Sequence, residues 1–96
     1  MAVILDVRTP GEVAEGHLEG ALFVDFLADD FRDKIVELDK SADYIVHCRS
    51  GNRSGKVAAW LISRGLDAVN MTGGMQAWAA DGLPVVTDSG SAGTVI

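Results

Sequence analysis

The feature that most constrains the fold of this chain is a short apolar run that stops at a cysteine, with a polar loop and a helical pattern after it. The run is Tyr44-Ile45-Val46, and its aromatic and β-branched residues are typical of a buried strand. Beyond the loop, apolar residues recur at helical spacing from Val57 to Ile62. Cys48, the single cysteine, therefore lies where a strand passes into a helix. In open parallel α/β sheets, ligands bind at this end of the strands.

The loop that follows Cys48 offers several groups that stabilise a thiolate. Its small residues can turn backbone N–H groups inward as an anion-binding nest, and the next helix adds the positive end of its dipole. Arg49 and Arg53 supply positive charge on either side. We therefore predict a pKa for Cys48 below the ordinary value of about 8.5 and a nucleophilic thiolate. The alternative is a small core cysteine with solvated arginines. A core cysteine, however, has no need of two arginines, a glycine and a helix start beside it.

Strand and helix patterns alternate along the rest of the chain, which indicates an α/β fold with a parallel sheet. The expected strands are residues 2–7, 21–24, 43–48 and 67–71. Thr9 and Pro10 open a short helix, and residues 27–38 repeat apolar side chains at the 3.6-residue spacing of an amphipathic helix. The helix after the cysteine loop is expected to end near Arg64, because Gly65 supplies a left-handed C-terminal cap.

Composition and charge argue against several classes of function. The net charge of −6 argues against nucleic-acid binding, which requires a basic face. One cysteine and two histidines without ligand spacing give little support to a metal site. The apolar runs are short and no basic n-region precedes them, so we expect neither a membrane span nor a secretory signal. The expected compartment is the cytoplasm, where a reactive thiol stays reduced.

Three motifs follow one another in a definite order. The first comprises Asp6-Val7-Arg8, Glu12, Gly16-His17-Leu18 and Gly20-Ala21, the second runs from Cys48 to Ser54, and the third is Gly73-Gly74 with Ala77-Trp78. In order and spacing they resemble the signatures of the single-domain rhodaneses, the thiosulfate sulfurtransferase family, across residues 3–85. Family members usually carry a helix and a short edge strand before the segment at Val3, and this chain shows neither. We therefore expect strand 67–71 to be an open edge of the sheet.

The resemblance implies a rhodanese-like three-layer sandwich, in which a parallel sheet of about four strands is flanked by helices. The implied spatial order of the strands is 67–71, 43–48, 2–7, 21–24. Residues 1–86 would form the rhodanese-like domain, and residues 87–96, rich in Gly and Ser, would form a flexible tail or linker. In the alternative arrangement, Thr94-Val95-Ile96 folds back as a strand that covers the open edge.

For the site, the resemblance implies that Cys48 is the catalytic residue and that the rest of its loop binds substrate. The substrate-binding residues would be Arg49, Ser50, Gly51, Asn52, Arg53 and Ser54. Asp6 and Arg8 would give structural support through an ion pair or hydrogen bonds, with Arg8 and Glu12 as expected partners. His17 would be structural. His47 precedes Cys48 directly, but successive strand side chains point to opposite faces, so we do not expect it to act as a base.

The function that the resemblance implies is sulfur transfer. The Cys48 thiolate would take the outer sulfur of thiosulfate or a related donor as a persulfide and pass it to cyanide or a thiol, a protein acceptor included, without a metal or organic cofactor. One alternative is a non-catalytic binding or persulfide-relay module of a larger protein. Another is a cysteine phosphatase or arsenate reductase. Those enzymes place their arginine after five intervening residues, whereas four separate Cys48 from Arg53.

Overall fold

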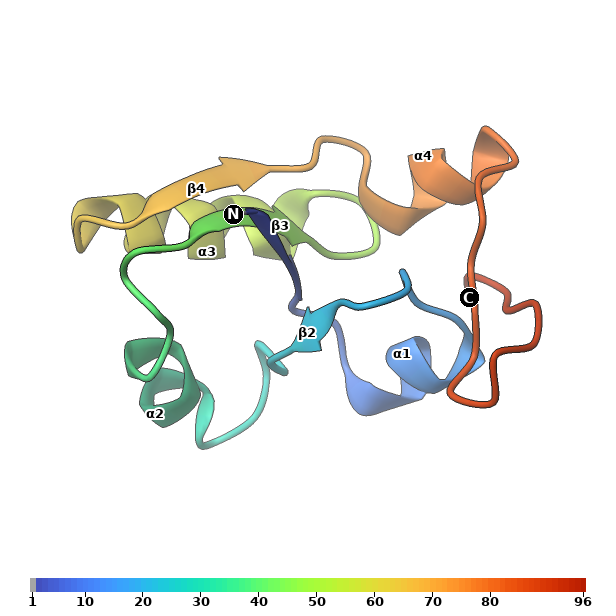
Figure 1. Ribbon diagram of the computed structural model, residues 1–96, viewed down its shortest axis with the longest axis horizontal. Coiled ribbons are helices and arrows are strands. Elements are labelled where there is room, and N and C mark those ends of the chain that lie inside the picture. Colours follow the sequence, from blue (N-terminus) through green and yellow to red (C-terminus); the bar gives the residue numbers. More distant parts are fainter. Residues whose placement is uncertain (1) are drawn as a thin grey trace.

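Four parallel strands form the sheet of the computed structural model, which describes residues 2–96 (Figure 1). In chain order they are β1 (Ala2–Asp6), β2 (Leu22–Phe23), β3 (Asp43–His47) and β4 (Asp67–Asn70). Their order across the sheet is β2-β1-β3-β4, so the predicted spatial order is confirmed. Within the described residues, no strand pairs with the outer side of β4. This side of the sheet is therefore the open edge that was expected.

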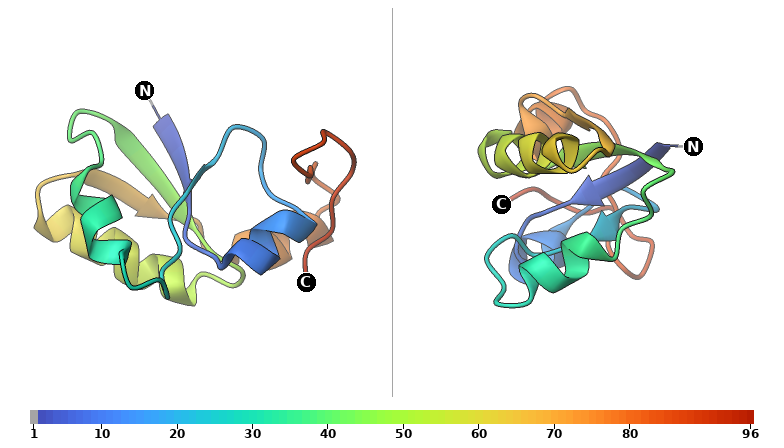
Figure 2. Two further views of the ribbon diagram at one scale, coloured as in Figure 1. Left: turned by 90° about the horizontal axis from the view of Figure 1, so that it is seen from below. Right: turned by 90° about the vertical axis from the view of Figure 1, so that its left-hand side faces the viewer.

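Four α-helices of the described chain flank the sheet, and the predicted α/β class is confirmed. They are α1 (Pro10–Glu15), α2 (Phe31–Val36), α3 (Asn52–Ser63) and α4 (Gly74–Ala80). Helices α2 and α3 lie on the same side of the sheet, while α1 and α4 lie beyond the carboxyl ends of the strands (Figure 2). Over residues 2–96, none of the helices has the length and apolar character needed to cross a membrane.

The helix expected over residues 27–38 is shorter in the structure, because a turn precedes it. The Asp25 carboxylate accepts a hydrogen bond from the Leu27 N–H at 2.9 Å, which closes this turn ahead of α2. Leu27 is 68% exposed, so it does not belong to the buried stripe. Within α2, Ile35 is buried and Phe31 packs against the core. Leu38 packs against the core as well, although α2 ends at Val36, so the apolar spacing identifies the core-facing side chains better than the bounds of the helix.

The two faces of the sheet are covered differently along β3 and β4. Tyr44 and Val46 belong to the buried core, together with Val57 of α3. On the opposite face, Ile45 and Val69 are neighbours in the register of the two strands and are 36% and 65% exposed. One face is therefore the core of the protein, and the other leaves apolar side chains in contact with water.

The C-terminal part of the chain returns to the side of α1. His17 and Val86 exchange backbone hydrogen bonds of 2.8 and 2.9 Å in an isolated antiparallel bridge. Further along, the Thr94 N–H donates to the Glu15 carbonyl at 2.8 Å. The last residues therefore lie against α1 and do not form the alternative strand over the edge of β4. The domain boundary after residue 86 and a mobile tail stay predictions, because a contact does not measure motion.

Candidate active site

The site is built at the carboxyl end of β3, where the chain turns into α3. Gly51 precedes the first residue of α3 with φ 103° and ψ −6°, a left-handed conformation that glycine adopts at little cost. A Cβ at this position would also lie 3.3 Å from the Gly73 amide nitrogen. The turn aims the Gly51 N–H at the Cys48 sulfur, 3.1 Å away. A glycine is thus required where the loop reverses over the thiol.

The Cys48 thiol is 1% exposed and is surrounded by hydrogen-bond donors. Burial raises the pKa of the thiol, but hydrogen bonds from the Ser54 hydroxyl and from the backbone N–H groups of Ser54, Gly51 and Ser50 outweigh it. The pKa of Cys48 is lowered from 9.0 to about 7. The predicted direction is confirmed, so more of the thiol is ionised at neutral pH than at its ordinary pKa. Backbone and hydroxyl donors produce this shift without a neighbouring base.

Asn70, at the end of β4, is a part of the site that sequence reasoning missed. Its Nδ2 donates to the Gly51 carbonyl at 3.2 Å, and its Oδ1 accepts from the Ser54 hydroxyl at 2.6 Å. The same hydroxyl lies 3.4 Å from the Cys48 sulfur. Because a hydroxyl has one hydrogen, Ser54 donates to either Asn70 or the sulfur. Donation to Asn70 suits the neutral thiol, and rotation toward the sulfur suits the thiolate.

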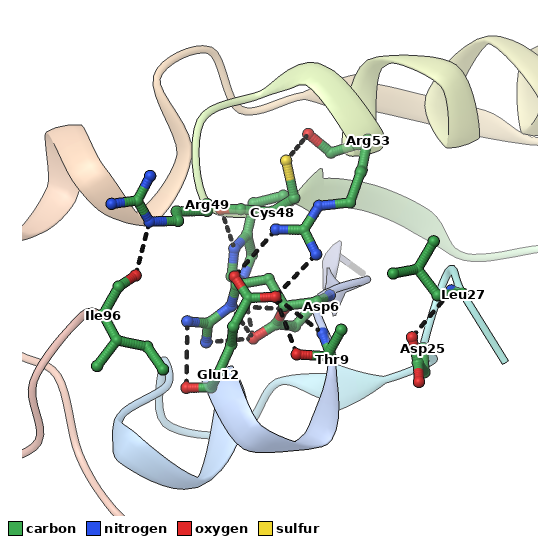
Figure 3. Close-up of polar contacts among 12 residues, drawn as sticks. Asp6, Thr9, Glu12, Asp25, Leu27, Cys48, Arg49, Arg53 and Ile96 are labelled. Carbon is green, nitrogen blue, oxygen red and sulfur yellow. Dashed lines mark hydrogen bonds and ion pairs between the residues drawn. The ribbon is translucent and has the colours of Figure 1, made fainter.

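Arg53, from the first turn of α3, forms a bidentate ion pair with Glu12 of α1 (Figure 3). Its Nη1 and Nη2 lie 2.8 and 2.9 Å from the two carboxylate oxygens. Thr9 holds the same carboxylate through its N–H at 3.2 Å and its hydroxyl at 3.0 Å. The Arg53 hydrogen bonds are the main reason that the pKa of Glu12 is lowered to about 2. The pair ties the start of α3 to the start of α1.

Arg49 lies on the other side of the loop and has a different partner. Its Nε donates to the backbone carbonyl of Ile96 at 2.6 Å, and this hydrogen bond is exposed. The side chain points away from the Cys48 sulfur and toward the C-terminal segment (Figure 3). The two arginines that the sequence places around the thiol are therefore both engaged with protein groups.

Asp6 and Arg8 form a buried ion pair beneath the site, with exposures of 0% and 2%. Arg8 Nη2 and Nε lie 2.7 and 2.9 Å from the Asp6 carboxylate oxygens. Arg8 Nη2 also donates to the Gly16 carbonyl at 2.9 Å. Arg8 and Glu12 are partners, as expected, but through a hydrogen bond and not an ion pair: Arg8 Nη1 donates to the Glu12 backbone carbonyl at 3.5 Å, because the carboxylate faces Arg53.

The two histidines lie away from the thiol chemistry. His47 is fully buried, its Nε2 is 3.8 Å from the Asp6 carboxylate, and burial is the main reason that its pKa is lowered. Among residues 2–96, no hydrogen bond joins its ring to the Cys48 sulfur. The His17 ring lies 2.9 Å from the Val13 carbonyl, next to α1. Neither ring is placed to deprotonate Cys48.

The remaining loop residues contribute to the site through their backbone more than through their side chains. Ser50 and Asn52 are exposed, and the Ser50 contribution to the thiolate comes from its N–H. In the described part of the chain, no group of three or more His, Cys, Asp or Glu side chains is arranged to hold a metal ion. The arrangement offers one activated sulfur in a ring of N–H and O–H donors.

Comparison with known proteins identifies the family of this chain. Residues 1–81 match the family model of the rhodanese-like domain. A sulfurtransferase of Allochromatium vinosum is 38% identical over 89 residues, which cover 92% of this chain and 81% of that protein. The thiosulfate sulfurtransferase GlpE of Ectopseudomonas mendocina is 36% identical over 91 residues, which cover 94% and 81%. The crystal structure of a rhodanese-related protein from Thermoplasma volcanium matches with a TM-score of 0.84 at 33% identity, over 91% of this chain and 85% of that one. The chain therefore belongs to the rhodanese-like domain family.

Proposed function

We propose that this protein is a sulfurtransferase that moves the sulfane sulfur of thiosulfate, or a related donor, to cyanide or a thiol through a persulfide on Cys48. The observation that carries the proposal is the Cys48 thiol, whose pKa is lowered to about 7 inside a loop of inward-pointing donors. Membership of the rhodanese-like family and relatives named as sulfurtransferases support a transferase in general. The name of the Ectopseudomonas relative supports thiosulfate as the donor.

In the first half of the reaction, the Cys48 thiolate attacks the outer sulfur of thiosulfate. A sulfur–sulfur bond to Cys48 forms, the sulfur–sulfur bond of thiosulfate breaks, and sulfite leaves with the bonding electron pair. The persulfide that remains carries a negative terminal sulfur. The N–H groups of Ser50 and Gly51 and the hydroxyl of Ser54 are the donors that would stabilise it. No metal or organic cofactor enters this step.

In the second half, a nucleophilic acceptor attacks the terminal sulfur of the persulfide. With cyanide the product is thiocyanate, and with a thiolate acceptor the product is a persulfide of that acceptor. The sulfur–sulfur bond of the Cys48 persulfide breaks, and its electron pair stays on the Cys48 sulfur, which becomes a thiolate again. A thiol on another protein is chemically equivalent to a small one. A reducing compartment such as the cytoplasm would keep the free thiol available between turnovers.

The substrate-binding role of the loop is part of this proposal. The loop residues Arg49, Ser50, Gly51, Asn52, Arg53 and Ser54 would bind the donor, with the N–H groups of Ser50 and Gly51 and the Ser54 hydroxyl facing the transferred sulfur. Four residues separate Cys48 from Arg53, which makes a tight ring that suits one sulfur atom better than a tetrahedral oxyanion. We therefore expect persulfide formation with thiosulfate and negligible hydrolysis of aryl phosphates.

Intact-mass spectrometry after thiosulfate treatment tests the proposal. The wild-type protein should gain one sulfur atom, located on Cys48 and removed by cyanide. The matched control is Cys48→Ser, which keeps a similar shape but cannot form a persulfide, so it should gain nothing and lose all thiosulfate:cyanide activity. Substantial activity in a folded Cys48→Ser protein would contradict the mechanism. Turnover of an aryl phosphate that depends on Cys48 would favour the phosphatase alternative.

A further inference from the structure

Residues 92–96, here called the strap, lie against α1 and end beside the Cys48 loop (Figure 3). The Gly93 N–H donates to the Val85 carbonyl and the Thr94 N–H donates to the Glu15 carbonyl, both at 2.8 Å. At its end, the Ile96 carbonyl accepts the 2.6 Å hydrogen bond from Arg49 Nε. The strap therefore connects the first helix to one arginine of the candidate active site.

Two glycines allow the strap to approach this closely. A Cβ at Gly93 would lie 2.7 Å from the Gly16 Cα and 3.0 Å from the Glu15 carbonyl oxygen. A Cβ at Gly16 would lie 2.5 Å from the Thr94 carbonyl oxygen. Real Cβ atoms essentially never approach so closely, so the two backbones can touch only while both positions lack a side chain. A methyl group at Gly93 therefore forces a shift between the strap and the end of α1.

The two loop arginines differ in how readily they can be released. Arg53 would have to break two hydrogen bonds to Glu12, both between charged groups that are largely shielded from water. Arg49 would lose a single hydrogen bond, which is exposed to solvent, to the backbone oxygen of Ile96. Its guanidinium points away from the thiol and toward Ile96 (Figure 3). Arg49 is therefore the positive charge that an incoming anion can recruit.

We propose that the strap is a positioning segment of the site, which competes with the anionic sulfur donor for Arg49. With the strap in place, Arg49 is turned away from the Cys48 sulfur. When the strap lifts, the freed guanidinium can turn to the donor. The apparent affinity for the donor then scales with the fraction of molecules in which Arg49 is free. This inference rests on the proposed function for its substrate.

Steady-state kinetics with thiosulfate test the strap through Gly93→Ala. We expect a KM for thiosulfate roughly three- to tenfold lower than in the wild type with kcat unchanged, because only the availability of Arg49 changes. Gly11→Ala is the matched control, since a Cβ there meets no atom within 4 Å. Thr94→Pro is a second variant, which removes the N–H that bonds Glu15 and should lower KM in the same way.

A double variant assigns the effect to Arg49. In Gly93→Ala/Arg49→Ala, the decrease in KM for thiosulfate that Gly93→Ala causes should disappear. An unchanged or higher KM in both Gly93→Ala and Thr94→Pro overturns the proposal. A decrease in KM that Gly93→Ala still causes in the Arg49→Ala background overturns it as well. A merely structural role of the strap would change kcat and thermal stability, and would leave no coupling between the two positions.

Binding of sulfite separates this inference from the proposed function. Sulfite is titrated into Cys48→Ser, alone and combined with Gly93→Ala, and the 15N resonance of Arg49 Nε is followed by NMR. This measurement needs no sulfur transfer. Tighter sulfite binding with the Gly93→Ala change supports the strap even if the wild-type protein forms no persulfide. Equal sulfite affinity with and without Gly93→Ala overturns the strap even if persulfide does form.

Discussion

Two regions of the chain hold the arginines of the Cys48 loop, and they hold them with unequal strength. Helix α1 holds Arg53 through two hydrogen bonds of 2.8 and 2.9 Å, between side chains that are 24% and 15% exposed. The strap holds Arg49 through one exposed hydrogen bond to the backbone oxygen of Ile96. Bidentate pairs of charged groups are the stronger kind, and they also fix geometry.

This difference separates two roles that look alike in the sequence. Arg53 and its partner Glu12 fix how α3 starts, and with it the backbone donors that face the thiol. Arg49 keeps the freedom to change partner. A charge that is firmly paired shapes a site, whereas a charge that is loosely paired can bind a ligand.

The largest effect is expected from breaking the α1 contact at Arg53. Arg53→Ala should lower kcat/KM for thiosulfate roughly ten- to a hundredfold, because the pair with Glu12 fixes the donors that face the thiolate and a misplaced hydrogen bond to a charged group costs about 1.5–3 kcal/mol. Arg49→Ala should cost about threefold or less, since the strap already withholds that side chain in most molecules. Arg32→Ala, an exposed arginine of α2, is the control in the same assay. Equal losses for Arg53→Ala and Arg49→Ala would remove the distinction between the two regions.

Lowering the pH should weaken the ion pair between Arg53 and Glu12, because the Glu12 carboxylate becomes protonated. Its pKa is about 2 in the folded protein against 4.5 as the ordinary value, so its stabilisation is complete above pH 4.5 and is lost as the pH falls through 2. The full contribution is about 3 kcal/mol, of which about 2 kcal/mol is gone at pH 3. Urea unfolding at pH 6 and pH 3 measures the loss.

The matched comparison for the acid effect is made within one helix. Glu12→Gln should lose less stability than the wild type between pH 6 and pH 3, by about 2 kcal/mol. Glu15→Gln, also in α1, should behave as the wild type. If Glu12→Gln shows the same pH dependence as the wild-type protein, the ion pair with Arg53 does not stabilise the fold in solution.

Much of the fold and part of the site could be predicted from the sequence, for reasons that lie in local patterns. Buried strands such as β3 and the cysteine loop are continuous segments, so residue type and order are enough to find them. The glycine at position 51 and the donors around Cys48 belong to the same segment. The order of the strands came from the family resemblance, because alternation of strands and helices leaves it open.

The parts that could not be predicted depend on contacts between distant segments. Asn70 reaches Ser54 and Gly51 only because β4 lies beside β3. Glu12 is 41 positions from Arg53, and nothing in its surroundings distinguishes Arg53 from Arg8 as the partner. The hold of the strap on Arg49 spans 47 positions. Charge and residue type in the sequence show which side chains can form ion pairs or hydrogen bonds. Which of them pair with each other depends on how the folded chain brings distant segments together.

The smallest effect concerns the mobility of the strap, which amide hydrogen exchange can measure. The amides of Gly93 and Thr94 each make one hydrogen bond near the surface, and Gly and Ser dominate the residues before them. We expect weak protection there, far below that of the Tyr44 amide in the central strand. Protection of Thr94 as strong as that of Tyr44 would contradict a strap that lifts, and would reject the flexible tail predicted for residues 87–96.

The exposed pair Ile45 and Val69 has a consequence for how this protein behaves at high concentration. Apolar side chains on an uncovered sheet beside an open strand edge favour contact between copies of the chain. The net charge of −6 keeps the copies apart at neutral pH. This repulsion fades as the pH approaches the isoelectric point or as salt screens it. Solubility should therefore be lowest in mildly acidic, salty buffers, and Val69→Lys should raise it there.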